Sequence, residues 1–136
     1  EDLRWVEFDP KLKIETRNID INHLILDSRL IVHGYDSTGV LETLSQNIPS
    51  LVFLENGLNH LHENIKSDYQ MLIDVGIMHI NSTSLADKVN EIWDNINDWW
   101  EQKEVKEARI KFSNLYAKSC DHPAKKMSSL LMEDHC

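Results

Sequence analysis

The sequence predicts an α/β fold with a small parallel sheet flanked by helices. Short apolar runs, of the length of buried strands, alternate with longer segments in which apolar residues recur every three or four positions. Strands that alternate with helices in this way pair in parallel through right-handed crossovers. A length of 136 residues fits a single α/β domain, residues 1–136, with one core.

The amino-terminal part is predicted to contain two strands separated by a short helix. Residues 3–8 are expected to form the first strand, which Asp9 and Pro10 end. A short helix over residues 20–27, with apolar residues at helical spacing, leads into the second strand at residues 29–33.

The most informative stretch is residues 29–53, which combines strand, polar turn, helix and strand. The turn at residues 34–39 is rich in Gly, Asp and Ser, and a helical stretch follows at residues 40–46. Pro49 precedes the third predicted strand at residues 50–54. This βαβ unit directs the free N–H groups of the helix start beyond the carboxyl end of the strand.

The residue types in this turn favour an anionic ligand. Ser37 or Thr38 can cap the helix, and Gly39 keeps side-chain bulk away from the backbone. The N–H groups of the first helical turn lie at the positive end of the helix dipole. Glu42 lies about one helical turn onward, where its carboxylate can accept hydrogen bonds from vicinal hydroxyls. A phosphate next to a ribose has this pattern of groups.

The string over residues 36–39, followed by Glu42 and by Asn47-Ile48-Pro49, resembles a known donor-binding turn. That turn belongs to the C-terminal domain of GT-B glycosyltransferases and their relatives, the CDP-glycerol glycerophosphotransferases and UDP-N-acetylglucosamine 2-epimerases. Residues 25–118 as a whole are similar to a group of transferases from bacterial surface-carbohydrate clusters. The further stretches that carry this similarity are residues 75–79, 89–100 and 107–109.

The resemblance implies a Rossmann-like half of a GT-B donor domain, in which Ser37, Thr38 and Gly39 contact the diphosphate and Glu42 holds the ribose. The chain would be the nucleotide-sugar-binding part of a glycosyl- or related group-transferase in surface polysaccharide biosynthesis. Its partners would be a nucleotide diphosphate sugar, as substrate and not as cofactor, and an amino-terminal acceptor domain outside this C-terminal fragment. The isolated fragment is expected to be inactive. A UDP-sugar 2-epimerase or a glycerophosphotransferase would use the same turn.

A polar loop is expected at residues 55–64, after the third strand, where ligands of open α/β sheets bind. Asn56, Asn59, His60 and Asn64 are candidate contacts for a donor sugar, and a solvated surface loop is the alternative interpretation.

The catalytic base is not identified by the sequence and is expected in the acceptor domain. His33, His60 and His62 are local candidates only. The turn also departs from the family pattern, because no arginine or lysine lies in it or just after it.

The carboxyl-terminal half is predicted to be mainly helical. A helix at residues 67–75 is expected to end at Gly76 and to lead into a fourth strand at residues 77–80. Residues 81–84 then cap a long helix. Its apolar stripe consists of Leu85, Val89, Ile92, Trp93 and Ile96. A second amphipathic helix presents Val105, Ala108, Phe112, Leu115 and Tyr116. Together these two helices are expected to cover one face of the sheet, with the tail from Pro123 as a last helix or as a contact with the acceptor domain.

Composition limits the other partners. A net charge of −9 would repel a nucleic-acid backbone, and no apolar stretch approaches the length of a membrane span. The sequence therefore predicts a soluble cytoplasmic protein. Cys120 and Cys136 are expected to be free thiols of a reducing compartment, because two cysteines in 136 residues are too few for a disulfide framework. A zinc site formed with His122 and His135 is the alternative, and the close spacing of these four residues argues against it. A non-catalytic α/β binding or interaction module, docking a partner through its tryptophan-bearing helices, is the alternative function.

Overall fold

The computed structural model describes residues 2–15, 18–118 and 120–133 of the chain. In chain order these residues form α1 (Asp2–Phe8), α2 (Ile21–Leu26), β1 (Ile31–His33), α3 (Thr38–Ser45), β2 (Ser50–Phe53), α4 (Glu63–Asp74), β3 (Met78–His79), α5 (Ser82–Ile92), α6 (Ile96–Trp100), α7 (Lys103–Tyr116) and α8 (Pro123–Glu133).

The strands form one parallel sheet in the order β1-β2-β3. Ile31 lies opposite Ser50 in the first pair of strands, and Val52 lies opposite Met78 in the second. Each pair is connected through one helix, so β1-α3-β2 and β2-α4-β3 are successive βαβ units. The predicted α/β class with a small parallel sheet flanked by helices is confirmed. The described residues hold three strands, however, and not the four that were expected.

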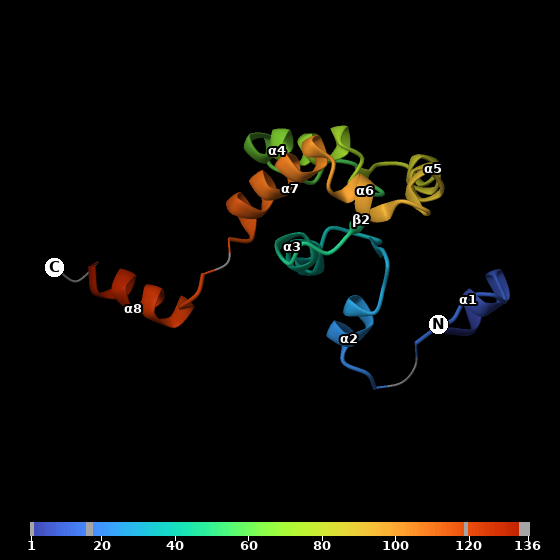
Figure 1. The fold of residues 1–136 in the computed structure, drawn as a ribbon, viewed down its shortest axis with the longest axis horizontal. Coiled ribbons are helices and arrows are strands. Elements are labelled where there is room, and N and C mark those ends of the chain that lie inside the picture. Colours follow the sequence, from blue (N-terminus) through green and yellow to red (C-terminus); the bar gives the residue numbers. More distant parts are fainter. Residues whose placement is uncertain (1, 16–17, 119, 134–136) are drawn as a thin grey trace.

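The segment that was expected to form the first strand is a helix, α1. Trp5 and Phe8 are both exposed on it. A strand must pair its N–H and C=O groups with a neighbouring strand, whereas a helix pairs them within the segment. Because this segment lies away from the sheet, it has no strand to pair with (Figure 1). The aromatic and β-branched residues of the segment therefore did not decide its structure.

Two further boundaries differ from those expected. α4 begins at Glu63 and not at residue 67, so Asn64 belongs to this helix and not to the loop before it. An acidic residue in the first turn, here Glu63, stabilises a helix start through the helix dipole. The helix ends before Gly76, whose φ of 74° fits its predicted role as a C-cap glycine. The strand expected at residues 77–80 is shortened to β3.

The carboxyl-terminal helices α5 and α7 pack against different elements. α5 contacts β2 and β3, whereas α7 packs against the crossover helices α3 and α4. The two long carboxyl-terminal helices therefore do not cover one face of the sheet together, as was expected. In Figure 1, α7 runs between α3 and α4, and α5 lies at the other side of the sheet region.

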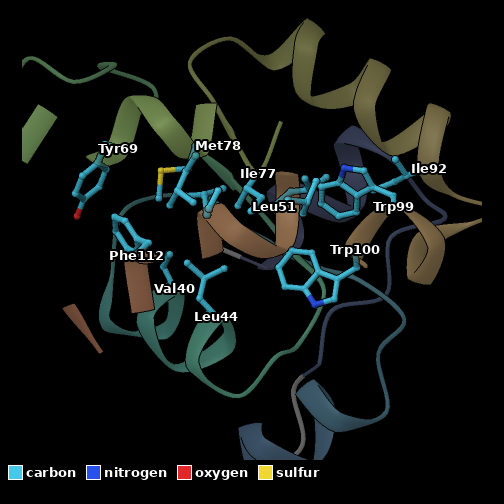
Figure 2. Packing of buried hydrophobic residues seen from close by; sticks show 14 of the residues in the cluster. Val40, Leu44, Leu51, Tyr69, Ile77, Met78, Ile92, Trp99, Trp100 and Phe112 are labelled. Atoms are coloured by element: carbon cyan, nitrogen blue, oxygen red, sulfur yellow. The ribbon is translucent and has the colours of Figure 1, made fainter. Parts of the chain in front are cut away.

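The core extends from α4 and α7 at one end to α5 and α6 at the other (Figure 2). Phe112, Leu51 and Ile77 are fully buried in this core. Aromatic rings supply much of the packing, since Tyr69 meets Phe112 edge-on with ring centroids 5.1 Å apart. Trp99 and Trp100 are both buried.

The expected single stripe over residues 85–96 is interrupted, because α5 stops at Ile92 and α6 starts at Ile96. Asn81 caps α5 as predicted, since its side chain accepts a hydrogen bond from the Ser84 N–H. After the interruption Ile96 is buried, but Trp93 is 47% exposed and lies outside the core. On α7, Leu115 is likewise exposed, unlike the rest of its predicted stripe.

α1 and α8 lie apart from the sheet and from each other (Figure 1). The tail from Pro123, expected either as a last helix or as a contact with the acceptor domain, forms the helix α8. Its apolar residues Met127, Leu130 and Leu131 are exposed. Within the part of the chain that the structure describes, no helix has the length and apolar character needed to cross a membrane.

Candidate functional site

The turn between β1 and α3 forms the candidate anion site. Ser37 takes the N-cap position of α3 with extended backbone, and its carbonyl accepts a hydrogen bond from the Val40 N–H at 3.0 Å. Its side chain makes no capping hydrogen bond, so the hydroxyl does not serve the helix end as a cap. Thr38 is the first helical residue and is exposed. The hydroxyls of Ser37 and Thr38 therefore lie at the same helix end as the N–H groups that the first helical turn leaves without intrahelical partners.

Gly39 lies at a close approach behind the turn. A Cβ atom at this position would lie 3.3 Å from Cε1 of His33 and 3.4 Å from Oγ of Ser37. The first distance is shorter than an ordinary van der Waals contact, and the second lies at the lower limit of one. The glycine thus allows the start of α3 to sit directly against the side chain that ends β1.

His33 is tied to α3 by a hydrogen bond. Its Nε2 lies 3.0 Å from Oγ1 of Thr43, and the Thr43 hydroxyl donates to the Val40 carbonyl. Nε2 is therefore the donor to Thr43, which leaves Nδ1 as an acceptor. Burial lowers the pKa of His33, so the imidazole is neutral at pH 7.

A cavity of about 240 Å³ opens beside this turn, at the carboxyl ends of β1 and β2. We call it the strand-end pocket. The turn after β1 and the loop after β2 contribute its lining residues, which are Gly34, Tyr35, Asp36, Leu54, Glu55, Asn56 and His60. The sequence-predicted contacts Asn56 and His60 are thus brought next to the turn. Asn59 and Asn64 do not line this pocket.

Asp36 is held in place from the core. The hydroxyl of Tyr69 donates to Oδ2 of Asp36 at 3.0 Å, and Nε2 of His60 lies 3.9 Å from the same oxygen. Tyr69 is 8% exposed, and burial together with the bond to Asp36 raises its pKa. The phenol therefore keeps its proton and donates it to the carboxylate. This contact joins residues 33 positions apart, and no local pattern in the sequence indicates it.

Glu42 lies in a different place from the pocket. It is exposed and borders a second, smaller cavity of about 140 Å³ between α2 and α3. The residues that line this cavity are Asn22, Ile25, Leu26, Glu42, Thr43, Gln46 and Ile48. A ligand that reached both the turn and Glu42 would have to extend along the surface of α3.

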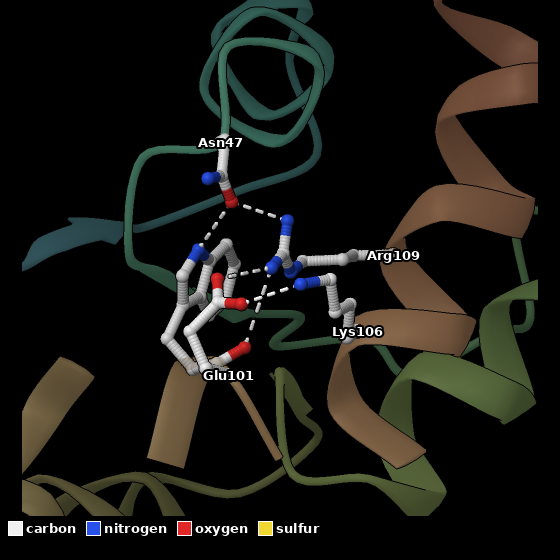
Figure 3. A network of polar contacts seen from close by, with 5 residues as sticks. Asn47, Glu101, Lys106 and Arg109 are labelled. Atoms are coloured by element: carbon white, nitrogen blue, oxygen red, sulfur yellow. Dashed lines mark hydrogen bonds and ion pairs between the residues drawn. The ribbon is translucent and has the colours of Figure 1, made fainter. Parts of the chain in front are cut away.

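A polar cluster closes the opposite end of α3, where Asn47 follows the helix with a φ of 61° (Figure 3). Oδ1 of Asn47 accepts hydrogen bonds from Nη1 of Arg109 and, at 2.9 Å, from Nε1 of Trp100. The guanidinium also donates to Oε1 of Glu101 at 2.8 Å and stacks on the Trp100 ring. Lys106 bonds the other oxygen of the same carboxylate. We call these residues the Arg109 cluster.

The Arg109 cluster joins α3, α6 and α7. Arg109 is only 4% exposed, and burial lowers its pKa while the nearby Glu101 carboxylate opposes that shift. Three stretches on which the sequence resemblance rests, residues 47–49, 89–100 and 107–109, meet here. One residue of each stretch, Asn47, Trp100 and Arg109 respectively, is thus explained by packing within the fold.

A family model described as LIC12162 family transferase matches residues 1–131. The chain belongs to this family of transferases. The match includes the turn, the strand-end pocket and the Arg109 cluster. A search of curated proteins found no match to the chain, and a search of solved structures found none either.

The histidines of this LIC12162 family transferase differ in their surroundings. His60 is half exposed at the pocket, and His62 is exposed at the N-cap position of α4 without a side-chain capping bond. His79, which the sequence did not single out, is buried between Gly76 and Ser84. Its Nε2 lies 3.1 Å from the Gly76 carbonyl and its Nδ1 lies 2.8 Å from the Ser84 hydroxyl, so both ring nitrogens are occupied by the fold.

Among the described residues, no group of three or more His, Cys, Asp or Glu side chains is placed to hold a metal ion. Cys120 is exposed and free. His135 and Cys136, which the sequence analysis considered with it, lie outside the described residues. The hydrogen-bond donors of the turn itself are backbone N–H groups and the hydroxyls of Ser37 and Thr38.

Proposed function

We propose that this LIC12162 family transferase binds the nucleotide-sugar donor at the turn between β1 and α3. In this proposal it is the donor-binding part of a GT-B-like glycosyl- or related group-transferase that acts in surface polysaccharide biosynthesis. The observation that carries the proposal is the start of α3 at the carboxyl end of β1, directly beside the strand-end pocket. Ligands of open α/β sheets bind at this edge, with phosphate groups against a helix start.

The diphosphate would lie against the first turn of α3. Its oxygens would accept hydrogen bonds from the N–H groups of this turn and from the hydroxyls of Ser37 and Thr38. A helix start contributes about 0.3 to 1 kcal/mol toward a nearby anion, and up to about 2 kcal/mol when partly buried. The same donors would stabilise the charge that develops on the leaving nucleotide as the bond to the sugar breaks.

The positive charge that balances the diphosphate would come from the acceptor domain. The residues that line the strand-end pocket include Asp36 and Glu55 but no lysine or arginine. A donor held between two domains, with its cation on the second one, agrees with this distribution. Glu42 would bind the ribose if the nucleoside ran along α3 toward α2.

The test is a calorimetric titration of the chain with UDP, CDP and GDP. We expect one nucleoside diphosphate to bind, and we expect Ser37→Ala and Glu42→Ala each to weaken it by about 1 to 3 kcal/mol, the cost of a lost hydrogen bond to a charged group. Thr83→Ala is the matched control, since Thr83 lies in the first turn of α5, away from the pocket. If no nucleotide binds, or if both variants bind as the original chain does, the assignment of the turn is wrong.

A non-catalytic interaction module is the second candidate function. It is favoured by α1 and α8, which present exposed apolar residues such as Phe8 and Leu131. Under this alternative the hydroxyls of the turn carry no ligand, and none of the three nucleotides binds. A 2-epimerase remains the less favoured enzyme, because the family is one of transferases.

A further inference from the structure

We propose that the strand-end pocket binds the glycosyl part of the donor and selects neutral or amino sugars over acidic ones. This inference rests on the proposed donor-binding function and names the substrate class of that site. The residues that set the selection are Asp36 and Glu55, the two carboxylates of the pocket.

The size of the pocket limits what it can hold. Its volume is about 240 Å³. Sites that enclose a whole drug-sized ligand measure roughly 300 to 1,000 Å³. A complete nucleotide sugar therefore does not fit inside, whereas one sugar ring does. With the diphosphate at the start of α3, the part of the donor that reaches the adjoining pocket is the sugar.

The charge of the pocket sets the class of sugar. Two carboxylates line it, and His60 is the only other ionisable side chain in the lining besides Tyr35. No lysine or arginine among the lining residues offers a partner to a sugar carboxylate. Hydroxyl groups and an ammonium group donate hydrogen bonds to carboxylates, whereas a uronic acid would place a third negative charge beside two existing ones.

The position of Asp36 is fixed before a ligand arrives. A side chain that is more than nine-tenths buried, Tyr69, extends its hydroxyl from the core to Oδ2 of this carboxylate. Phe112 packs edge-on against the Tyr69 ring and holds it in place. Within the described part of the chain, Oδ1 of Asp36 has no hydrogen-bond partner. This oxygen is the acceptor that we assign to a sugar hydroxyl or ammonium group, and its fixed position reduces the entropy lost on binding.

Two other lining residues suit a sugar ring. Tyr35 is 70% exposed, and its ring can cover the apolar C–H face of a sugar. Asn56 carries both a donor and an acceptor for ring hydroxyls. Together with the carboxylates they provide an apolar platform and convergent polar groups, the combination found in small-molecule sites.

The experiment uses methyl glycosides, so that it does not depend on the base of the nucleotide. Methyl glucoside, methyl glucosaminide and methyl glucuronide are titrated into the isotope-labelled chain, and the backbone resonances of Tyr35, Asn56 and His60 are followed by NMR. We expect the neutral and amino glycosides to shift these resonances in a saturable way. The glucuronide should bind roughly five- to tenfold more weakly, given the repulsion between close carboxylates in a solvent-exposed site.

Two variants separate charge from shape. Asp36→Asn and Glu55→Gln should each reduce the preference for the glucosaminide over the glucuronide, because each removes one negative charge and keeps the shape. Asp87→Asn, an exposed carboxylate on α5 outside the pocket, should leave the preference unchanged. Equal binding of glucosaminide and glucuronide, or no shift of the three resonances with any glycoside, would overturn the inference. Because nucleotide titration is a separate measurement, nucleotide binding without sugar selection refutes this inference alone, and loss of nucleotide binding refutes the proposed function.

Discussion

The polar groups at the two ends of α3 differ in their burial and in their hydrogen-bond partners. At its carboxyl end, Asn47 and Arg109 meet in a cluster where the guanidinium is almost completely buried. At its amino end, Asp36 is anchored by Tyr69 on one oxygen but borders an open pocket. Most donors of the first cluster join helices, although among the described residues Nε of Arg109 has no hydrogen-bond partner, and Asn47 and Arg109 line a cavity of about 320 Å³. The second end leaves hydroxyls and a carboxylate oxygen available. Both ends of α3 therefore border a cavity, and they differ in how far their polar groups are buried and bonded within the fold.

The same comparison separates the motifs on which the resemblance rests into those with contacts inside the fold and those without. Asn47, Trp100 and Arg109, which come from three of these stretches, take part in one network of contacts inside the fold. The hydroxyl of Ser37 has no comparable explanation, since it does not cap the helix that it precedes. Changes at the carboxyl end of α3 should therefore act on stability, and changes at the amino end should act on binding.

The largest effect is expected for Arg109→Ala. The substitution removes hydrogen bonds to Asn47 and Glu101 and the contact with the Trp100 ring, so we expect the free energy of unfolding to fall by about 2 to 4 kcal/mol. Urea denaturation measures this loss. Lys106→Ala is the matched control, because it removes a cation from the same Glu101 carboxylate at the exposed surface and should cost much less. Similar losses in both variants would show that burial of Arg109 is unimportant.

Asn47 combines two roles, and two substitutions separate them. Asn47→Ala loses the acceptor shared by Arg109 and Trp100 and also places alanine at a φ of 61°, so about 1 to 3 kcal/mol of stability should be lost. Asn47→Gly loses the acceptor but tolerates the backbone conformation, and it should be the more stable of the two variants. Chemical denaturation of both gives the comparison. A glycine variant as stable as the original chain would show that the hydrogen bonds accepted by Asn47 do not stabilise the fold.

At the other end of α3, Tyr69→Phe should lower stability by only about 0.5 to 1.5 kcal/mol, since it removes one hydrogen bond and keeps the aromatic packing. Its larger consequence should be weaker sugar selection, because Asp36 loses its anchor. Tyr116→Phe is the control, as its hydroxyl bonds Asp68 outside the pocket. Denaturation and the glycoside titration are carried out on both variants. If the two variants select sugars equally well, Tyr69 does not position Asp36.

The smallest effect is a dependence of stability on pH. Burial lowers the pKa values of His33 and His79 below their usual 6.5, so the folded state binds fewer protons than the unfolded state as the pH falls through that value. Stability should therefore decrease between about pH 7 and about pH 5. Urea midpoints measured over this range check the sign. His79→Gln should flatten the profile, whereas replacement of the exposed His122 should not. A profile that rises on acidification would contradict the burial of these rings.

The βαβ unit and the helix after Asn81 could be predicted from local patterns. Apolar runs, a polar turn and a capping asparagine are signals that act over a few residues, and the structure confirms them. The strand expected at residues 3–8 was wrong because its propensity could not reveal that no neighbouring strand is available. Trp93 was misplaced for a related reason, since the expected continuous helix is interrupted after Ile92 and the buried stripe does not continue through this tryptophan.

The candidate site likewise contains features that the sequence could predict and features that it could not. The position of Ser37, Thr38 and Gly39 at a helix start could be predicted from sequence because a strand, a turn and a helix start are contiguous there, and their contact with a ligand stays a prediction. The Tyr69 anchor of Asp36 and the meeting of Asn47 with Arg109 could not, since each joins residues that lie far apart in the chain. The sequence by itself determined the alternation of strands and helices and the position of the turn, because these depend on local backbone and apolar patterns. Only the tertiary structure decided which polar groups are consumed by packing and which remain open to a ligand, because burial and hydrogen-bond partners exist only once distant segments have come together.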